Sequence, residues 1–289
     1  HVVGEVPVGG DGSEITLTVD QCHFHVKGTI PDLVTFVGPP ALVTHSIQIH
    51  ILNSIFQGQN ELLRGVSGIN LNYRELEVIV MIHNTSFISF NVSEAVISIQ
   101  CLDPNTTVVV HDTLFKDNHY SNAALLISDC SKVCIDGAIF TDNKASRCNA
   151  PALRITHWSK ELKVHTAVVR SQFTLNEGLH RGCKSALDLD IRGRLPSTPI
   201  QSSIRSVEFV HGPESEEIFM NLEHTESRMS NNTFFRIKCV GGDFQAVQSK
   251  IFIEGLHIAV CPGIYPWILQ QAEVHISQIT NLRYMVLEE

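Results

Sequence analysis

A six-residue pattern, apolar-x-polar-x-x-Phe, recurs along this chain of 289 residues and constrains its fold more than any other feature. Internal repeats indicate one structural unit stacked on the next. Successive copies end 21 to 36 positions apart (Ile258 to Ile279 and Phe173 to Phe209), which suits a coil with variable insertions better than fixed-length helical repeats. The copies are 19–24, 51–56, 82–87, 110–115, 135–140, 168–173, 204–209 and 229–234, with Ile in place of Phe in 253–258 and 274–279.

The pattern predicts a strand, a corner and a buried anchor in each copy. Alternating apolar residues before the corner, such as Val108 and Val110, indicate a strand with one buried face. The corner is the third position, because six of its ten residues are Asn, Asp or Gly, which tolerate left-handed backbone. Its occupants are Gln21, Asn53, Asn84, Asp112, Gly137, Arg170, Ser206, Asn231, Gly255 and Gln278. The anchors would stack as an internal ladder of Phe24, Phe56, Phe87, Phe115, Phe140, Phe173, Phe209, Phe234, Ile258 and Ile279.

Two further features repeat after the anchor. Asn118, Asn143 and Asn176 each follow a ladder Phe by three residues. Stacked side-chain amides there would form hydrogen bonds with the turn backbone and with one another. A second apolar segment comes next, so each coil should contain at least two sheets. These segments are 95–99, 124–127, 152–155, 186–191, 218–222 and 267–269.

The F-x-x-N repeats resemble those of right-handed parallel β-helix proteins, the pectin-lyase-like superfamily, and especially polymorphic outer-membrane-protein or adhesin-like repeats. The resemblance covers roughly residues 15 to 285. It departs from that pattern where paired glycines usually follow, because this chain has Asn122, Ala123 and Ala124 in one copy and Lys184, Ser185 and Ala186 in another.

We therefore predict an all-β chain, a right-handed single-stranded parallel β-helix of about ten coils. Residues 15–289 would form the β-helix domain, and residues 1–14 an N-terminal turn or linker. An antiparallel sandwich with coincidental Phe spacing is the alternative fold. Few residues follow the last anchor and residues 1–14 are turn-like, so we expect the ends of the coil to meet partners or neighbouring domains.

Composition indicates which partners and which cellular compartment suit this chain. The formal net charge is −9 with Lys and Arg scattered singly, which argues against a nucleic-acid partner. No apolar stretch approaches the roughly 20 residues of a membrane span. Eight cysteines without a C-x-x-C pair favour disulfides over structural zinc, and N-glycosylation triplets begin at Asn84, Asn91, Asn105 and Asn231. Together these features predict a secreted, extracellular glycoprotein.

Cysteines in adjacent coils can approach within disulfide reach, because neighbouring strands lie about 4.8 Å apart. Plausible pairs are Cys101 with Cys130, Cys148 with Cys183, and Cys239 with Cys261. Cys22 and Cys134 would then be unpaired or joined to other chains. Eight cysteines admit about 105 pairings, so the sequence leaves the connectivity open.

The strongest enzyme-like cluster is Asp188, Asp190, Arg192 and Arg194, which alternate with apolar residues and should stand on the outer face of one strand. In lyases of the resembled superfamily such acidic residues bind calcium and an Arg removes the sugar-ring proton. Pro199 occupies the place of the expected second Arg, and a solvated face of neutralising charges is the competing interpretation. Arg236, Ile237 and Lys238 are similar to a polygalacturonase fragment, but the carboxylate segments of those hydrolases are absent from the sequence.

The fifteen histidines suggest metal binding only weakly. His23 and His25 would project from one side of a strand, but the sequence names no third ligand. His83, His111, His257 and His275 fall at outward positions of the repeat, where surface packing or hydrogen bonding is the default role. We therefore predict no metal site and no cofactor.

The leading functional hypothesis is a non-catalytic structural or assembly module, a rigid rod with N-linked glycans that self-associates into filaments or contacts neighbouring domains. A polysaccharide lyase or hydrolase acting on acidic glycans in an outer groove is the enzymatic alternative. A glycan-binding adhesin is the third, with Tyr120, Trp158 and Tyr265 as exposed stacking surfaces.

Overall fold

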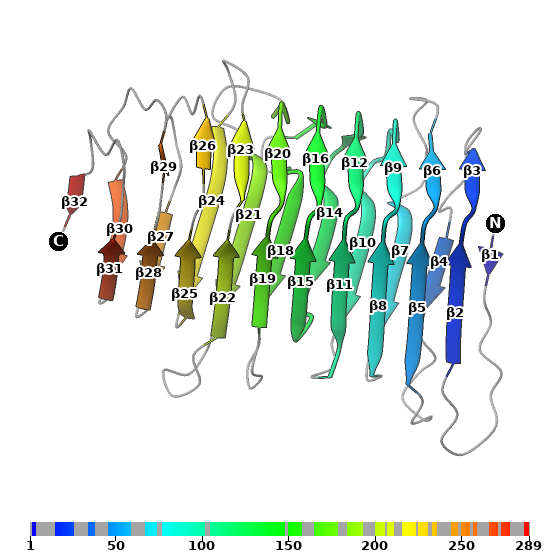
Figure 1. Cartoon of the computed structure of the whole chain (residues 1–289), viewed down its shortest axis with the longest axis horizontal. Coiled ribbons are helices and arrows are strands. Elements are labelled where there is room, and N and C mark those ends of the chain that lie inside the picture. The colour runs from blue at the N-terminus through cyan, green and yellow to red at the C-terminus, as the bar shows by residue number, and fades with distance from the viewer. Residues whose placement is uncertain are drawn as a thin grey trace.

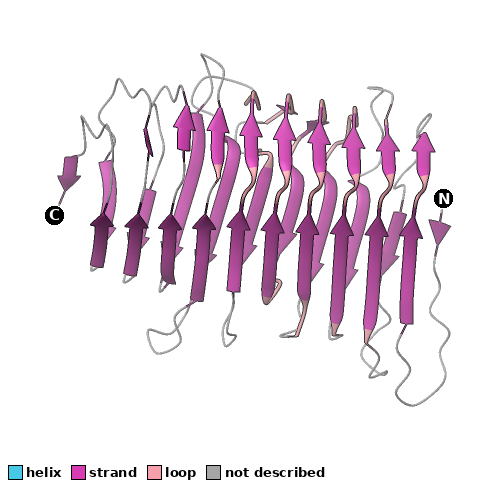
Figure 2. Cartoon of the chain, in the orientation of Figure 1, coloured by secondary structure: helices cyan, strands magenta, loops and turns pink. Residues whose placement is uncertain are grey.

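The computed structural model is built from strands, and no helix occurs among the residues that it describes (Figure 2). No described helix could therefore be long and apolar enough to cross a membrane. The described residues are 2–3, 15–25, 34–37, 46–58, 67–73, 77–101, 105–147, 150–157, 165–178, 184–192, 200–205, 207–210, 216–223, 225–230, 233–235, 244–247, 250–254, 257–258, 266–270, 273–277 and 286–288.

Three parallel sheets run along the long axis of the molecule (Figure 1). Sheet B, the lower front row in Figure 1, contains the strand of each repeat copy that precedes the corner. Its strands, in spatial order, are β2 (Ile15–Asp20), β5 (Ile47–Leu52), β8 (Val78–His83), β11 (Thr107–His111), β15 (Lys132–Asp136), β19 (His165–Val169), β22 (Ile200–Arg205), β25 (Thr225–Ser230), β28 (Lys250–Glu254) and β31 (Glu273–Ser277).

Sheet C, the upper row in Figure 1, contains the short strands that bear the anchor residues. It comprises β3 (His23–His25), β6 (Ile55–Gln57), β9 (Ser86–Ile88), β12 (Leu114–Lys116), β16 (Ile139–Thr141), β20 (Gln172–Thr174), β23 (Glu208–Val210), β26 (Thr233–Phe235) and β29 (His257–Ile258). A small sheet of β13 (His119–Tyr120) and β17 (Lys144–Ala145) follows two of these strands.

Sheet A lies behind the other two and contains the second apolar segments of the repeat. Its strands are β1 (Val2–Val3), β4 (Val34–Val37), β7 (Ser67–Tyr73), β10 (Ala95–Cys101), β14 (Ala123–Ser128), β18 (Leu153–His157), β21 (Lys184–Arg192), β24 (Glu216–Glu223), β27 (Phe244–Val247), β30 (Pro266–Gln270) and β32 (Val286–Glu288). Val2 and Val3, within the predicted linker, pair with β4.

The sequence therefore coils through sheets B, C and A in turn, and every strand pairing among the described residues is parallel. This arrangement confirms the predicted parallel β-helix architecture and excludes the antiparallel sandwich for these residues. Side chains are described almost throughout four successive turns, β8–β9–β10, β11–β12–β14, β15–β16–β18 and β19–β20–β21.

The corner between sheets B and C is made by a residue with positive φ, as the pattern predicts. The described corner residues have φ between 46° and 67°, and they are Gln21, Asn53, Asn84, Asp112, Gly137 and Arg170. Five of these corner amides continue the ladder by donating to a carbonyl of the neighbouring turn, as Asp112 N does to Asp136 at 2.9 Å; the other four are Gln21, Asn53, Asn84 and Gly137. Corner residues beyond 178, namely Ser206, Asn231, Gly255 and Gln278, lie outside the described residues.

The anchors form a stacked column inside the coil. Ring centroids of consecutive residues from Phe24 to Phe173 are 4.7 to 5.2 Å apart, close to the spacing of neighbouring strands. The rings from Phe56 to Phe173 are fully buried. Backbone register continues through Phe209, Phe234 and Ile258, whereas Ile279 lies outside the described residues.

A second interior column consists of Asn118, Asn143 and Asn176, all fully buried. Asn118 Nδ2 donates to Asn143 Oδ1 at 2.9 Å, and Asn143 Nδ2 donates to Asn176 Oδ1 at 2.8 Å. Each amide also donates to the carbonyl of a Phe in the preceding turn, at 2.9 to 3.0 Å. The predicted amide ladder is therefore present, and it gives buried turn backbone its hydrogen-bond partners.

One structural column was not predicted from the sequence. The residue after the corner is Ser54, Thr85, Thr113 or Ser171 in four turns, and each of these side chains is buried. Each hydroxyl donates to the carbonyl two residues earlier, as Thr113 does to His111 at 3.0 Å. Ser54 and Ser171 also accept from the backbone N–H of the turn before, at Cys22 and Ala138. These hydroxyls fix the inner side of the corner.

Candidate functional site

The outer side of the same corner carries the densest cluster of imidazole and carboxylate groups among the described residues. The last residues of β8, β11 and β15 are His83, His111 and Asp136, and the sheet places them side by side in register. Leu52 and Val169 occupy the same position in the turns on either side. We call these three residues together with Asp112 and Arg170 the histidine row.

The centre of the row is His111. Its Nδ1 lies 2.9 Å from Nδ1 of His83 and 3.1 Å from Oδ2 of Asp112, the next residue in the corner. The two imidazole rings stack with centroids 4.9 Å apart and planes inclined by 30°. One ligand atom from each of His83, His111 and Asp112 falls within 4.8 Å of the others, so these residues could hold a metal ion.

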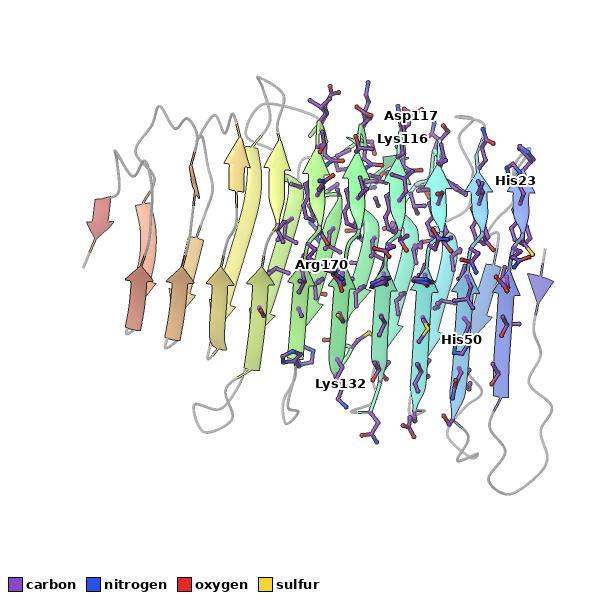
Figure 3. All side chains as sticks on the ribbon, viewed as in Figure 1. His23, His50, Lys116, Asp117, Lys132 and Arg170 are labelled. Carbon is purple, nitrogen blue, oxygen red and sulfur yellow. A yellow bond between two sulfur atoms is a disulfide. The ribbon has the colours of Figure 1, made fainter. Side chains whose placement is uncertain are left out.

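Asp136 and Arg170 form the other end of the row. The guanidinium of Arg170 donates to both carboxylate oxygens of Asp136, at 2.8 and 2.6 Å, in the fork geometry that suits a carboxylate. This hydrogen bonding, with the charges of Arg170 and His111, lowers the pKa of Asp136 below its ordinary value. Figure 3 shows Arg170 at the end of β19, and Asp136 Oδ2 also lies 3.8 Å from His111 Nε2.

The corner backbone determines where the Asp112 carboxylate sits. Asp112 has φ of 47°, and the next corner residue is Gly137 with φ of 67°. A Cβ on Gly137 would lie 2.3 Å from Asp112 Oδ1, so the absent side chain makes room for this carboxylate. On the other side, Asn84 Nδ2 donates to Asn53 Oδ1 at 2.9 Å, and Asn53 donates to Asp20.

The predicted enzyme-like cluster is only partly described, and its described member is not free. Asp188 is 3% exposed, and its Oδ2 accepts from Arg154 Nε at 3.1 Å. Arg154 also donates to Asn122 Oδ1. Asp188 is thus a buried ion-pair partner, so the interpretation of a solvated face does not hold for this residue. The side chains of Asp190 and Arg192 are not described, and Arg194 lies outside the described residues.

Tyr120 is also placed differently from the prediction. It was expected to be an exposed stacking surface, but it is 1% exposed and belongs to the core next to the small β13–β17 sheet. Burial raises the pKa of its phenol. The outward face of this strand is taken by His119, since neighbouring residues of a strand point to opposite faces. Trp158 and Tyr265 lie outside the described residues.

One predicted disulfide is confirmed. Cys101 and Cys130 are bonded across adjacent turns, with Cα atoms 4.8 Å apart. Cys22 and Cys134 are free thiols, and burial followed by the charge of Asp136 raises the pKa of Cys134. The other predicted pairs, Cys148 with Cys183 and Cys239 with Cys261, lie outside the described residues.

The glycosylation triplets differ in their surroundings. Asn84 and Asn105 are exposed, Asn91 is half-buried, and Asn231 lies outside the described residues. The Asn84 amide is already engaged with Asn53 on the outside of the corner. Asn105 is exposed in a turn before β11.

The other histidines singled out from sequence do not complete a ligand set. His23 and His25 lie on the same exposed side of β3, with ring centroids 4.2 Å apart, as predicted. Of the described residues, however, the one group that offers three ligand atoms is His83 with His111 and Asp112. His257 and His275 have backbone positions in β29 and β31, and their side chains are not described.

The sequence contained a signal for this cluster. His83 and His111 occupy the same position of consecutive repeat copies, immediately before the corner. Once the copies are stacked in register, equal positions become neighbours about 4.8 Å apart. Asp112 follows His111 directly and occupies the corner. Both histidines were predicted to face outward, and only the stacked register shows that the corner residue Asp112 joins them.

Comparison with known proteins returned no match to this chain: no protein-family model, no curated protein and no solved structure.

Proposed function

We propose that this chain is a non-catalytic structural module of an extracellular assembly, secreted and N-glycosylated. In finer detail, we propose a right-handed single-stranded β-helix of about ten coils, similar to pectin-lyase-like and adhesin-like repeats. Almost all crossover connections between parallel strands in one sheet are right-handed, which supports the handedness. The ten strands of sheet B support the coil number.

The observation that carries the structural role is the continuity of the two interior columns. Five phenylalanine rings in successive turns are fully buried and stacked, and a hydrogen-bonded amide column runs beside them. Close-packed interiors of this kind deform little, and each turn contacts mainly its neighbours. Such a rod holds its outer rows at fixed spacing, which is the property that a scaffold needs.

The contacts around the enzyme-like cluster favour this role over catalysis. The Asp188 carboxylate is buried and forms an ion pair with Arg154, so it is poorly placed to bind calcium in an outer groove. Tyr120, one of the aromatics on which glycan binding would depend, is in the core. The Cys101–Cys130 bond between turns supports passage through an oxidising compartment.

Expression through a eukaryotic secretory pathway, followed by electron microscopy, tests the proposal. We expect secreted protein whose mass falls on removal of N-linked glycans, and elongated particles or end-to-end filaments. The variant Asn105→Gln should remove one glycan. Compact globular particles, retention of unglycosylated protein, or release of unsaturated sugars from acidic polysaccharides would each contradict it, and the last would favour the lyase alternative.

A further inference from the structure

We propose that His83, His111 and Asp112 bind a divalent late transition-metal ion, with Zn²⁺ as the reference ion, on the outside of the corner between sheets B and C. The inference is independent of the structural role proposed above. It assigns a ligand to the centre of the histidine row.

The first argument is the proton count at His111. Its Nδ1 contacts Nδ1 of His83 at 2.9 Å and Oδ2 of Asp112 at 3.1 Å. A neutral imidazole carries one hydrogen, so His111 Nδ1 can point a hydrogen well at only one of these two acceptors. The two imidazole nitrogens and the Asp112 oxygen each carry a lone pair, and at most one proton can lie in the two contacts that join them. A cation between these atoms would attract all three.

The second argument is the distance between the ligand atoms. Zinc binds imidazole nitrogen and carboxylate oxygen at about 2.0–2.2 Å, so neighbouring ligands of a tetrahedral ion are about 3.3 Å apart. The two contacts of His111 are within a few tenths of an ångström of that separation. The parallel sheet supplies the spacing, because it places the two imidazoles in adjacent strands in register. The rings need only turn from their stacked orientation to direct their lone pairs at one point.

The third argument concerns the groups around the three ligands. Asp136 Oδ2 lies 3.8 Å from the far nitrogen of His111, too long for a hydrogen bond but near enough for its negative charge to favour a cation on this imidazole. Arg170 holds Asp136 through two hydrogen bonds, and Gly137 leaves space for the Asp112 carboxylate. The His111 and Asp112 side chains are 33% and 55% exposed, so ions can enter and water can supply a fourth ligand.

The choice of metal follows from the ligands. Two imidazoles and one carboxylate suit Zn²⁺, Cu²⁺ or Ni²⁺, whereas Ca²⁺ and Mg²⁺ prefer sites made of oxygen ligands. We therefore expect Zn²⁺ to bind and Ca²⁺ or Mg²⁺ not to compete with it.

Calorimetric titration of the full chain with Zn²⁺ in metal-free buffer tests the site. His111→Ala and His83→Ala should each abolish one equivalent of binding or weaken it by more than about tenfold, since even the loss of an outer-shell group has that effect. Asp112→Asn keeps a residue that tolerates positive φ and should weaken binding less. His50→Ala is the matched control, because His50 lies half-buried on the outer face of the same sheet and outside the cluster (Figure 3).

A spectroscopic measurement keeps the outcome clear if a variant folds poorly. Co²⁺ bound to the unaltered chain should give visible absorption bands of a four-coordinate site, and Zn²⁺ should displace it. Loss of the bands in His111→Ala with an unchanged circular dichroism spectrum supports the assignment. The proposal is overturned if the chain binds no ion, if His83→Ala and His111→Ala bind as the parent does, or if the double variant of His23→Ala and His25→Ala removes the signal instead.

Discussion

The interior and the exterior of the coil follow opposite rules. Inside, neighbouring turns repeat the same residue: Phe stacks on Phe and Asn hydrogen bonds to Asn. Outside, the position before the corner changes from Leu52 to His83, His111, Asp136 and Val169 within five turns. Identical interior residues can stack at the fixed spacing of neighbouring strands. Different exterior residues place imidazole and carboxylate groups at particular turns only. Four substitutions or conditions can break or sharpen this contrast.

The largest effect should come from the phenylalanine column. Phe115→Ala removes a fully buried ring that stacks on Phe87 and Phe140, and we expect a loss of about 3–5 kcal/mol in the free energy of unfolding. The neighbouring Lys116→Ala, on the exposed face of the same strand, should change it by less than about 0.5 kcal/mol. Urea unfolding followed by circular dichroism measures both. Equal effects of the two variants would show that the column does not hold the coil together.

The amide column should give the next largest effect. Asn143→Ala leaves Asn118 N and the Phe115 carbonyl without their buried partners, at about 1–3 kcal/mol for each group, so we expect a loss of about 3 kcal/mol. Asn53→Ala is the exterior match, because its amide is also stacked but exposed. It should cost about 1 kcal/mol through its left-handed backbone. A larger loss for Asn53→Ala in the same unfolding assay would reverse the contrast between the two faces.

Acid should weaken the coil through the interior residue His157. Burial lowers the pKa of His157 to about 4, and the charge of Asp129 partly opposes this shift. The folded state therefore binds fewer protons than the unfolded state between the two pKa values. Stability is complete above about pH 6.5 and falls as pH drops toward 4, by at most about 3 kcal/mol. Thermal unfolding across this range should show the decline, and His157→Leu should remove that part of it.

The smallest effect is expected at the exterior ion pair. Arg170→Ala breaks both hydrogen bonds to Asp136, but Arg170 is exposed. Pairs of exposed charges contribute little to stability, so we expect the smallest change of the four, and one that shrinks further in high salt. Thermal unfolding at low and high salt is the measurement. A loss as large as that of Phe115→Ala would mean that the outer row carries the fold.

Much of the architecture could be predicted because each repeat copy contains the local pattern of one strand, one corner and one buried anchor. The alternating strand, the corner residue and the anchor occupy six consecutive positions, and the positive φ of Asn53, Asn84 and Asp112 follows from their side chains. The Asn column was predictable for the same reason. The hydroxyl column at Ser54, Thr85 and Thr113 was missed, because Ser and Thr at a turn have many other uses in a single sequence.

The candidate site was harder to predict because it depends on contacts between turns. His83 and His111 are 28 residues apart in the chain, and only the register of β8 and β11 brings their nitrogens together. Asp188 was predicted to stand on the outer face because it alternates with apolar residues, but alternation says nothing about what covers that face. Tyr120 was predicted to be exposed from its residue type alone. In β13 it occupies the buried face, and His119 occupies the other face.

The sequence by itself determined the period, the corners and the identity of the interior columns, because each coil is specified within a short stretch by side-chain size and backbone preference. Only the tertiary structure decided which outer residues become neighbours. Insertions between copies vary in length, so neighbours across turns are set by position within the repeat and not by linear spacing. The hydrogen bonds between parallel strands fix that register, and with it the meeting of His83, His111 and Asp112.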